Sequence, residues 1–175
     1  MSFASQAAEE GKTALTFQET LRVHQAMVFS IAYHFLRDPS AAEEIAQDVF
    51  LQLYRRFDEI ESVDHARFWL RKTASHRAID YVRKHKRASV ALEDIAEPSV
   101  APAAGDPFLN RKLQALIASL PETPRMLTIL RYQEEMMPEE IAETLDMPVR
   151  TVKSHLHRAL TLLREKMART VGDSR

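Results

Sequence analysis

Apolar side chains recur at helical spacing in several segments of the chain, and the strict alternation that would indicate a strand occurs nowhere. Residues 21–36 carry apolar side chains on nearly every side, which is typical of a helix buried between others. This helix is expected to end at Asp38, because Pro39 disfavours helical geometry in the residue before it. Residues 1–17 are predicted to form a loosely ordered N-terminal tail.

A second helix is predicted to follow, with Ser40 and Glu43 forming an S-x-x-E capping box at its start. One apolar stripe at helical spacing consists of Ala46, Val49, Phe50, Leu53 and Phe57. A second stripe on the same helix consists of Gln47, Leu51 and Tyr54. Two stripes on one helix indicate that one faces the core and the other faces a partner, unless both belong to the core.

The third predicted helix covers residues 65–86, with Asp64 as its N-cap. Its inward positions are Leu70, Ala74, Ala78, Tyr81 and Val82. Its outward side carries Arg67, Arg71, Lys72, His76, Arg83 and Lys84. Residues 88–107 then combine three Pro, one Gly and only acidic charges, which predicts a flexible linker. Further helices are expected at residues 108–120 and 124–132.

Residues 138–160 have the pattern of two short helices joined by a tight turn. Pro138 suits the first position of a helix, where its missing N–H costs nothing, and Asp146 tolerates the left-handed conformation of a turn better than most residues. The inward positions are Ile141, Ala142, Leu145, Val149, Val152 and Leu156. The outward or flanking positions of the second helix are Arg150, Thr151, Lys153, Ser154, His155, His157 and Arg158. Such groups bond phosphates and base edges in a major groove, so the pattern predicts a DNA-binding helix-turn-helix, with a plain helical hairpin as the alternative.

The net charge of −1 conceals a block pattern along the chain. Residues 61–87 carry a net charge of +5 and residues 149–169 also carry +5, whereas residues 122–146 carry −5. Two basic segments in separate halves indicate two contacts with a polyanion, because local charge governs binding to phosphates. Ordinary solvated helix faces are the alternative. The opposite charges of the linker and the basic helices also favour a closed form in which the two halves meet.

The composition argues against several other classes of protein. Apolar runs are shorter than the roughly 20 residues of a membrane span, the N-terminus lacks the pattern of a signal peptide, and Cys is absent. The cytoplasm is therefore the expected location. His155 and His157 point to different sides of a helix and make a poor pair of metal ligands, and motifs for catalysis or for a phosphate-binding loop are missing. We therefore expect no enzymatic activity, catalytic residue, metal, cofactor, membrane insertion or small-molecule substrate.

Three segments in this order, AAEEIAQDVFLQLYRRF, FWLRKTASHRAIDYVRKHKR and EEIAETLDMPVRTVKSHLHRAL, resemble the extracytoplasmic-function (ECF) sigma factors, which are bacterial transcription initiation factors. The resemblance implies an all-α fold of two small helical domains joined by a flexible acidic linker, with a helix-turn-helix in the second. The tail would cover residues 1–17, the region 2 domain residues 18–87, the linker residues 88–109 and the region 4 domain residues 110–171. This sequence departs from the family pattern at Asp146, where the turn usually has Gly.

The resemblance also implies partners and the residues that meet them. The partners are core RNA polymerase, through the β′ coiled coil and the β subunit, promoter DNA, and an anti-sigma factor. By this resemblance, the residues that dock on the polymerase are Gln47, Asp48, Leu51 and Tyr54. Region 2 would open the minus-10 element. The residues that would contact it are Asp64, His65, Arg67, Arg71, Lys72, Ser75, His76, Arg83 and Lys84. The residues that would contact the duplex minus-35 element are Arg150, Thr151, Lys153, Ser154, His155 and Arg158. A stand-alone helix-turn-helix regulator is the alternative, although it leaves the double stripe and the basic third helix unexplained.

Overall fold

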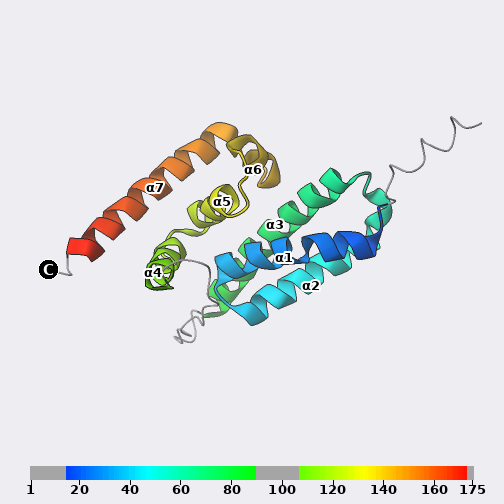
Figure 1. Cartoon of the computed structure of the whole chain (residues 1–175), viewed down its shortest axis with the longest axis horizontal. Helices are drawn as coiled ribbons and strands as arrows, with labels where there is room; N and C mark the ends of the chain where they lie inside the picture. The colour runs from blue at the N-terminus through cyan, green and yellow to red at the C-terminus, as the bar shows by residue number, and fades with distance from the viewer. Residues whose placement is uncertain (1–14, 90–106, 173–175) are drawn as a thin grey trace, which may run out of the picture.

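The computed structural model describes residues 15–89 and 107–172, and in these two ranges the regular structure is entirely helical (Figure 1). The helices of the first range are α1 (Phe17–Leu36), α2 (Pro39–Arg55) and α3 (Val63–Ser89), with a short 3-10 turn, η1 (Phe57–Glu59), between the last two. The helices of the second range are α4 (Pro107–Ala118), α5 (Glu122–Tyr132), α6 (Pro138–Thr144) and α7 (Val149–Gly172). The predicted all-α class is confirmed. The predicted linker lies largely in residues 90–106, outside the described ranges.

Helices α1, α2 and α3 pack side by side around an apolar core (Figure 1). Phe35, Leu53 and Leu70, one from each helix, are fully buried in it. Removing each such side chain from water contributes about 1.5–3 kcal/mol to folding. The predicted inward stripe of α2 is confirmed, because Val49, Phe50 and Leu53 are buried while the stripe's other members are half-buried.

Helix α1 begins earlier than predicted. The Thr16 side chain accepts a hydrogen bond from the Glu19 backbone N–H at 3.2 Å, so the helix begins at Phe17 instead of residue 21. It ends at Leu36, and the C-cap residue Arg37 follows with a φ of 62°, in the left-handed region. The prediction of a tail was therefore wrong at Phe17, and residues 1–14 lie outside the described part of the chain.

The predicted N-caps of α2 and α3 were both wrong, because each observed cap lies two residues before the predicted one. Asp38 caps α2, because its carboxylate accepts hydrogen bonds from the backbone N–H groups of Ser40 at 2.9 Å and Ala41 at 3.2 Å. Proline is tolerated in a first turn, so the helix includes Pro39 and the capping box at Ser40 does not form. Ser62 caps α3, since its Oγ accepts from the His65 N–H at 3.1 Å. Asp64 lies in the first turn, where its negative charge favours the helix N-terminus.

The second half contains the predicted helix-turn-helix in α6 and α7. Pro138 occupies the first turn of α6, and Asp146 adopts φ 53° in the turn that follows. Ile141 and Val152 are fully buried between the two helices and α5. Both the turn at Asp146 and the inward face are as predicted from the sequence.

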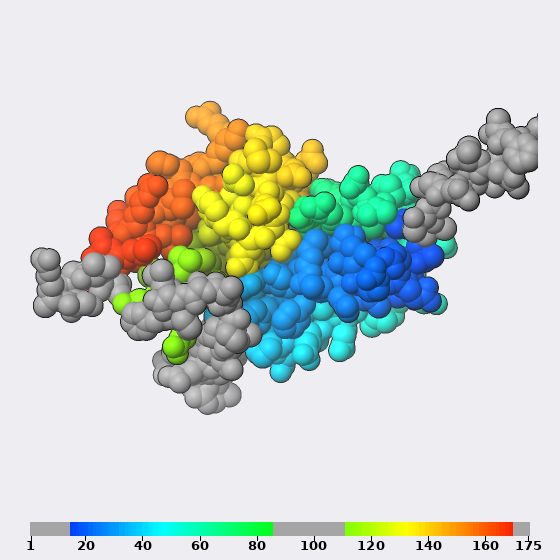
Figure 2. Space-filling model, in the orientation of Figure 1, coloured from blue at the N-terminus to red at the C-terminus, as the bar shows by residue number. Residues whose placement is uncertain are grey.

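The two halves are in contact. Helix α5 packs against α1 and α3, α6 packs against α3, and one apolar core extends from α1 through α5 to α7. Figure 2 shows the second half, in yellow and orange, resting directly on the blue and green surface of the first. The guanidinium of Arg125 on α5 contributes to this contact by donating to the Phe35 carbonyl at the end of α1, at 3.2 Å.

Candidate docking and nucleic-acid interfaces

The second stripe of α2 faces away from the core. Leu51 is 57% exposed and Tyr54 is 66% exposed, and Gln47 is exposed one turn earlier. The ring of Phe17 on α1 meets the Tyr54 ring edge-on, with 5.2 Å between the centroids, which limits the positions open to Tyr54. The structure therefore decides against the alternative in which both stripes belong to the core.

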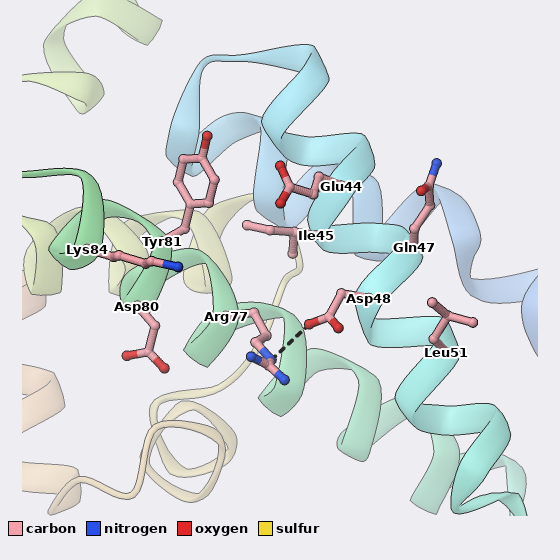
Figure 3. Close-up of a pocket in the computed structure, with 9 residues that line it drawn as sticks. All are labelled: Glu44, Ile45, Gln47, Asp48, Leu51, Arg77, Asp80, Tyr81 and Lys84. Carbon is pink, nitrogen blue, oxygen red and sulfur yellow. Dashed lines mark ion pairs between the residues drawn. The ribbon is translucent and has the colours of Figure 1, made fainter. Parts of the chain in front are cut away.

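A surface groove of about 440 Å³ lies between α2 and α3, beside this stripe (Figure 3). Gln47 and Leu51 line its α2 side, and an ion pair crosses it between Asp48 and Arg77, with 3.1 Å between Oδ2 and Nε. Arg77 was not among the residues singled out in the sequence, although its charge and its helix were evident. Asp48 also accepts a hydrogen bond from Gln52 at 3.1 Å, so this carboxylate is held in place from two sides.

The basic residues of α3 divide into exposed and covered groups. Arg67, Arg83 and Lys84 are exposed, whereas Lys72 and His76 are half-buried. Two of the predicted nucleic-acid contacts are instead buried, with Arg71 at 8% exposure and Ser75 at 0%. The prediction of an outward Arg71 was wrong in this arrangement, because α5 and the loop after it pack over that side of α3.

Arg71 and Glu134 form a buried ion pair between the two halves. The Arg71 Nη2 lies 3.6 Å from a Glu134 carboxylate oxygen and donates to the Glu134 carbonyl at 3.1 Å. Burial is the main influence on both groups: it lowers the pKa of Arg71 and raises the pKa of Glu134, against their mutual attraction. Desolvation thus offsets much of the Coulomb attraction, so the pair by itself adds little net stability to the contact.

The first turn of α3 holds the remaining predicted minus-10 residues. Asp64 is exposed, and His65 is half-buried with its Nδ1 accepting the Glu61 N–H at 3.2 Å. Phe68 is 37% exposed, and the Lys72 ammonium lies 6.0 Å from its ring centroid. An exposed aromatic ring beside cations is the combination that stacks and holds single-stranded bases.

The first turns of α7 present the second basic surface. Arg150, Lys153, Ser154 and Arg158 are exposed, while Thr151 and His155 are half-buried. Glu139 of α6 pairs with Lys153 at 2.8 Å. The predicted minus-35 residues therefore lie along one accessible stretch of the helix-turn-helix, with its buried side formed by Val152 and Leu156.

His24, which is buried, and His34, which is half-buried, predict a pH dependence of folding stability. Burial lowers the pKa of His24, with a further contribution from Arg67 and Arg71, and burial also lowers the pKa of His34, both below the ordinary 6.5. The unfolded chain therefore binds protons more readily than the folded chain. The stability that comes from keeping these two histidines neutral is fully present above about pH 6.5, and it is lost as the pH falls through their folded-state pKa.

Urea unfolding of the full chain at pH 7.5 and at pH 5.5 measures this effect. We expect a lower free energy of unfolding at pH 5.5, and a smaller difference in the double variant His24→Asn/His34→Gln. The variant His157→Gln, on the exposed side of α7, should keep the wild-type difference. Equal stability of the wild type at both pH values would contradict the assignment.

Together, the fold and these surfaces define a two-part helical protein with an exposed stripe on α2, a basic third helix and a helix-turn-helix whose accessible side is basic. Residues 20–88 match the family described as sigma-70 region 2, and residues 110–163 match sigma-70 region 4. The RNA polymerase sigma-E factor of Streptomyces coelicolor is 30% identical over 161 residues, which cover 92% of this chain and 91% of that protein. The ECF RNA polymerase sigma factor SigW of Bacillus subtilis is 29% identical, over 86% of this chain and 88% of SigW. This chain belongs to the ECF family of RNA polymerase sigma factors.

Solved structures share the fold. The sigma factor RpoE from Bartonella quintana, in complex with the anti-sigma factor NepR, has a TM-score of 0.73 at 21% identity, over 87% of this chain and 96% of RpoE. CnrH, in complex with the cytosolic domain of CnrY, has a TM-score of 0.63 at 20% identity, over 94% of each chain. In the ranges that the structure describes, we find no group of three or more His, Asp or Glu side chains that could hold a metal ion. Within the same ranges, no helix is long and apolar enough to cross a membrane.

Proposed function

We propose that this ECF sigma factor divides its work between two domains. The region 2 domain, residues 18–87, docks on core RNA polymerase and opens the minus-10 element. The region 4 domain, residues 110–171, binds the minus-35 element as duplex DNA. The observation that carries the proposal is the exposed stripe of α2, because apolar side chains as exposed as Leu51 and Tyr54 on an otherwise well-packed helix fit a protein partner.

The docking surface consists of Gln47, Asp48, Leu51 and Tyr54, and it continues into the groove between α2 and α3. A tyrosine and a leucine supply apolar contact area, while the fixed Asp48 carboxylate adds a charged position for orientation. The partner for this surface is the β′ coiled coil of the polymerase. The chain has further contacts with the β subunit.

The nucleic-acid surfaces follow the two basic segments. Along α3, the minus-10 element is bound by Asp64, His65, Arg67, Lys72, His76, Arg83 and Lys84, and also by Arg71 when the second half no longer covers it. Ser75, which is 0% exposed, is left out of this set. On α7, the minus-35 element is bound by Arg150, Thr151, Lys153, Ser154, His155 and Arg158. Lysine and arginine hold phosphates, and the first turns of a recognition helix meet base edges in the major groove.

The remaining features of the proposal concern the setting in which the chain acts. It works in the cytoplasm, without catalysis of its own, since the chemistry of transcription belongs to the polymerase. An anti-sigma factor regulates it, as the complex of RpoE with NepR suggests by analogy.

Co-elution with core RNA polymerase tests the docking surface. The wild type is expected to co-elute on gel filtration, and Leu51→Glu and Tyr54→Glu are expected to lose co-elution, because a carboxylate in an apolar contact must be desolvated without a partner. Val23→Glu is the matched control, since Val23 is 52% exposed on α1 and lies outside the α2 stripe. Co-elution of both α2 variants at the wild-type level would remove the docking role from this stripe.

The same experiment separates the proposal from a stand-alone helix-turn-helix regulator. Such a regulator would bind duplex DNA stably without polymerase and would not co-elute. Its support is confined to the second half of the chain, whereas the family match includes region 2.

A further inference from the structure

Carboxylates from the second half of the chain lie against basic side chains of α3. Lys72 Nζ lies 2.6 Å from Asp146 Oδ1, and His76 Nε2 lies 3.5 Å from Asp146 Oδ2. The His76 Nε2 is also 3.2 Å from the Thr144 carbonyl oxygen. One carboxylate in the turn of the helix-turn-helix thus meets two basic residues of the other domain.

Two further pairs extend this contact along α3. Arg71 meets Glu134 in the buried pair described above, and Arg83 Nε lies 3.6 Å from a Glu122 carboxylate oxygen. We call Arg71, Lys72 and His76, which are buried or half-buried, the covered basic face of α3, and Arg83 lies beyond it on the exposed surface. All four belong to the set proposed to hold the minus-10 strand, and each lies beside an acidic side chain of the segment from α5 to the turn after α6.

Asp146 is suited to this contact for a reason beyond its charge. Its φ of 53° is a conformation that glycine adopts freely and other residues adopt at a cost. A glycine would serve the turn better, yet it would bring no carboxylate to Lys72 and His76. The hydrogen bond from Lys72 is the main cause of a lowered pKa at Asp146, which keeps this carboxylate charged in the contact.

The contact is built so that it can be reversed. The Lys72 and Asp146 side chains are 36% and 62% exposed, so water and salt weaken their attraction. The buried Arg71–Glu134 pair has a large desolvation cost. The apolar core shared by α1, α5 and α7 brings the halves together, and the charged pairs fix which face of α3 is covered.

From these contacts we infer that the free sigma factor closes on itself, with the carboxylates of Asp146, Glu134 and Glu122 in the places that nucleic-acid phosphates take in the open form. Phosphates and these carboxylates compete for the same cations, so the closed chain does not bind the minus-10 strand. The closure itself stands on the geometry alone, whereas its effect on DNA binding rests on the proposed role of α3.

Energy transfer between two dyes on the full chain tests the closure. The chain has no cysteine, so Glu43→Cys on α2 and Glu165→Cys on α7, both exposed, give specific labelling of the two halves. Transfer in the otherwise wild-type chain should fall as salt is raised from about 0.05 M to about 0.5 M, because the Debye length shortens. Asp146→Asn and Lys72→Glu should lower transfer already at low salt, and the exchanged pair Lys72→Glu/Asp146→Lys should restore it.

Glu139→Gln is the matched control. It also removes one exposed carboxylate of the second half, but its partner Lys153 lies in the same half, so transfer should keep the wild-type value. Circular dichroism verifies that each variant is folded. Transfer that is independent of salt and equal in wild type and Asp146→Asn would overturn the closure, and so would a fall as large in Glu139→Gln as in Asp146→Asn.

Binding of a short single-stranded oligonucleotide of mixed sequence, without polymerase, tests the consequence. Asp146→Asn should bind it several-fold more tightly than the wild type at low salt, and Glu139→Gln should not. Lower transfer in Asp146→Asn together with unchanged oligonucleotide binding would keep the closure and would count against α3 as the minus-10 surface. The two failures are therefore distinguishable.

Discussion

Replacing Leu53 with alanine is expected to lower the free energy of unfolding by about 2–5 kcal/mol, and the same change at Leu51 by less than about 0.5 kcal/mol. The two leucines lie two positions apart on α2, yet Leu53 is fully buried and Leu51 is 57% exposed. Truncation at Leu53 removes apolar contacts and leaves a cavity among α1, α2 and α3. Truncation at Leu51 removes a side chain that is mostly in water.

Urea unfolding monitored by circular dichroism measures both changes. Leu51→Ala also serves as a functional contrast, because it should weaken co-elution with core polymerase while the fold stays intact. Similar losses of stability at the two positions would show that α2 is packed on both sides. That result would return the second stripe to the core and remove the basis of the docking surface.

Replacing Arg125 with methionine is expected to cost roughly 1–3 kcal/mol for each buried carbonyl that loses its partner. The Arg125 guanidinium donates to the Leu120 carbonyl from Nε at 3.3 Å and Nη2 at 3.0 Å, and to the Phe35 carbonyl from Nη1 at 3.2 Å. It also lies over the Phe35 ring, with 5.4 Å from Cζ to the centroid. Burial lowers the pKa of Arg125, which reflects the low polarity around this cation. Methionine fills similar space without any donor, so the change isolates the hydrogen bonds.

Arg22→Met provides the comparison, since Arg22 pairs only with Glu19 on the exposed surface of α1 among the contacts that the structure gives it, and its loss should leave stability unchanged. Thermal and urea unfolding of the two variants are compared with the wild type. Because Arg125 also joins the two halves, Arg125→Met should lower energy transfer in the labelled chain as well. Wild-type stability and transfer in Arg125→Met would show that neither carbonyl depends on it.

The proposed closed arrangement links DNA binding to domain separation. A protein whose binding-competent form is only partly populated shows an affinity reduced by that fraction. The docking that we propose for the exposed stripe of α2 does not require separation, since Leu51 and Tyr54 are accessible in the closed form. We therefore expect docking to come first and the covered basic face of α3 to become available afterwards.

The local pattern of the sequence determined the helices and their inward faces. Spacing at three and four residues identified Leu53, Leu70 and Ile141 as core residues, because an apolar stripe must be removed from water. The turn at Asp146 was evident too, since it depends on neighbours in the chain. Helix starts were less accurate, because Asp38 and Ser62 compete with nearby residues for the same backbone N–H groups.

Only the tertiary structure decided which polar residues face water and which face each other. The basic block around α3 and the acidic block at residues 122–146 were visible as net charges of +5 and −5. The pairing of these two blocks was not visible. The sequence led us to expect the acidic linker as the partner of the basic helices, and that linker lies largely outside the described residues. Long-range pairing depends on how α5 and α6 pack on α3, which neither helical periodicity nor local charge encodes. Arg71 is therefore buried beside Glu134, although its position on the helix predicted an exposed side chain.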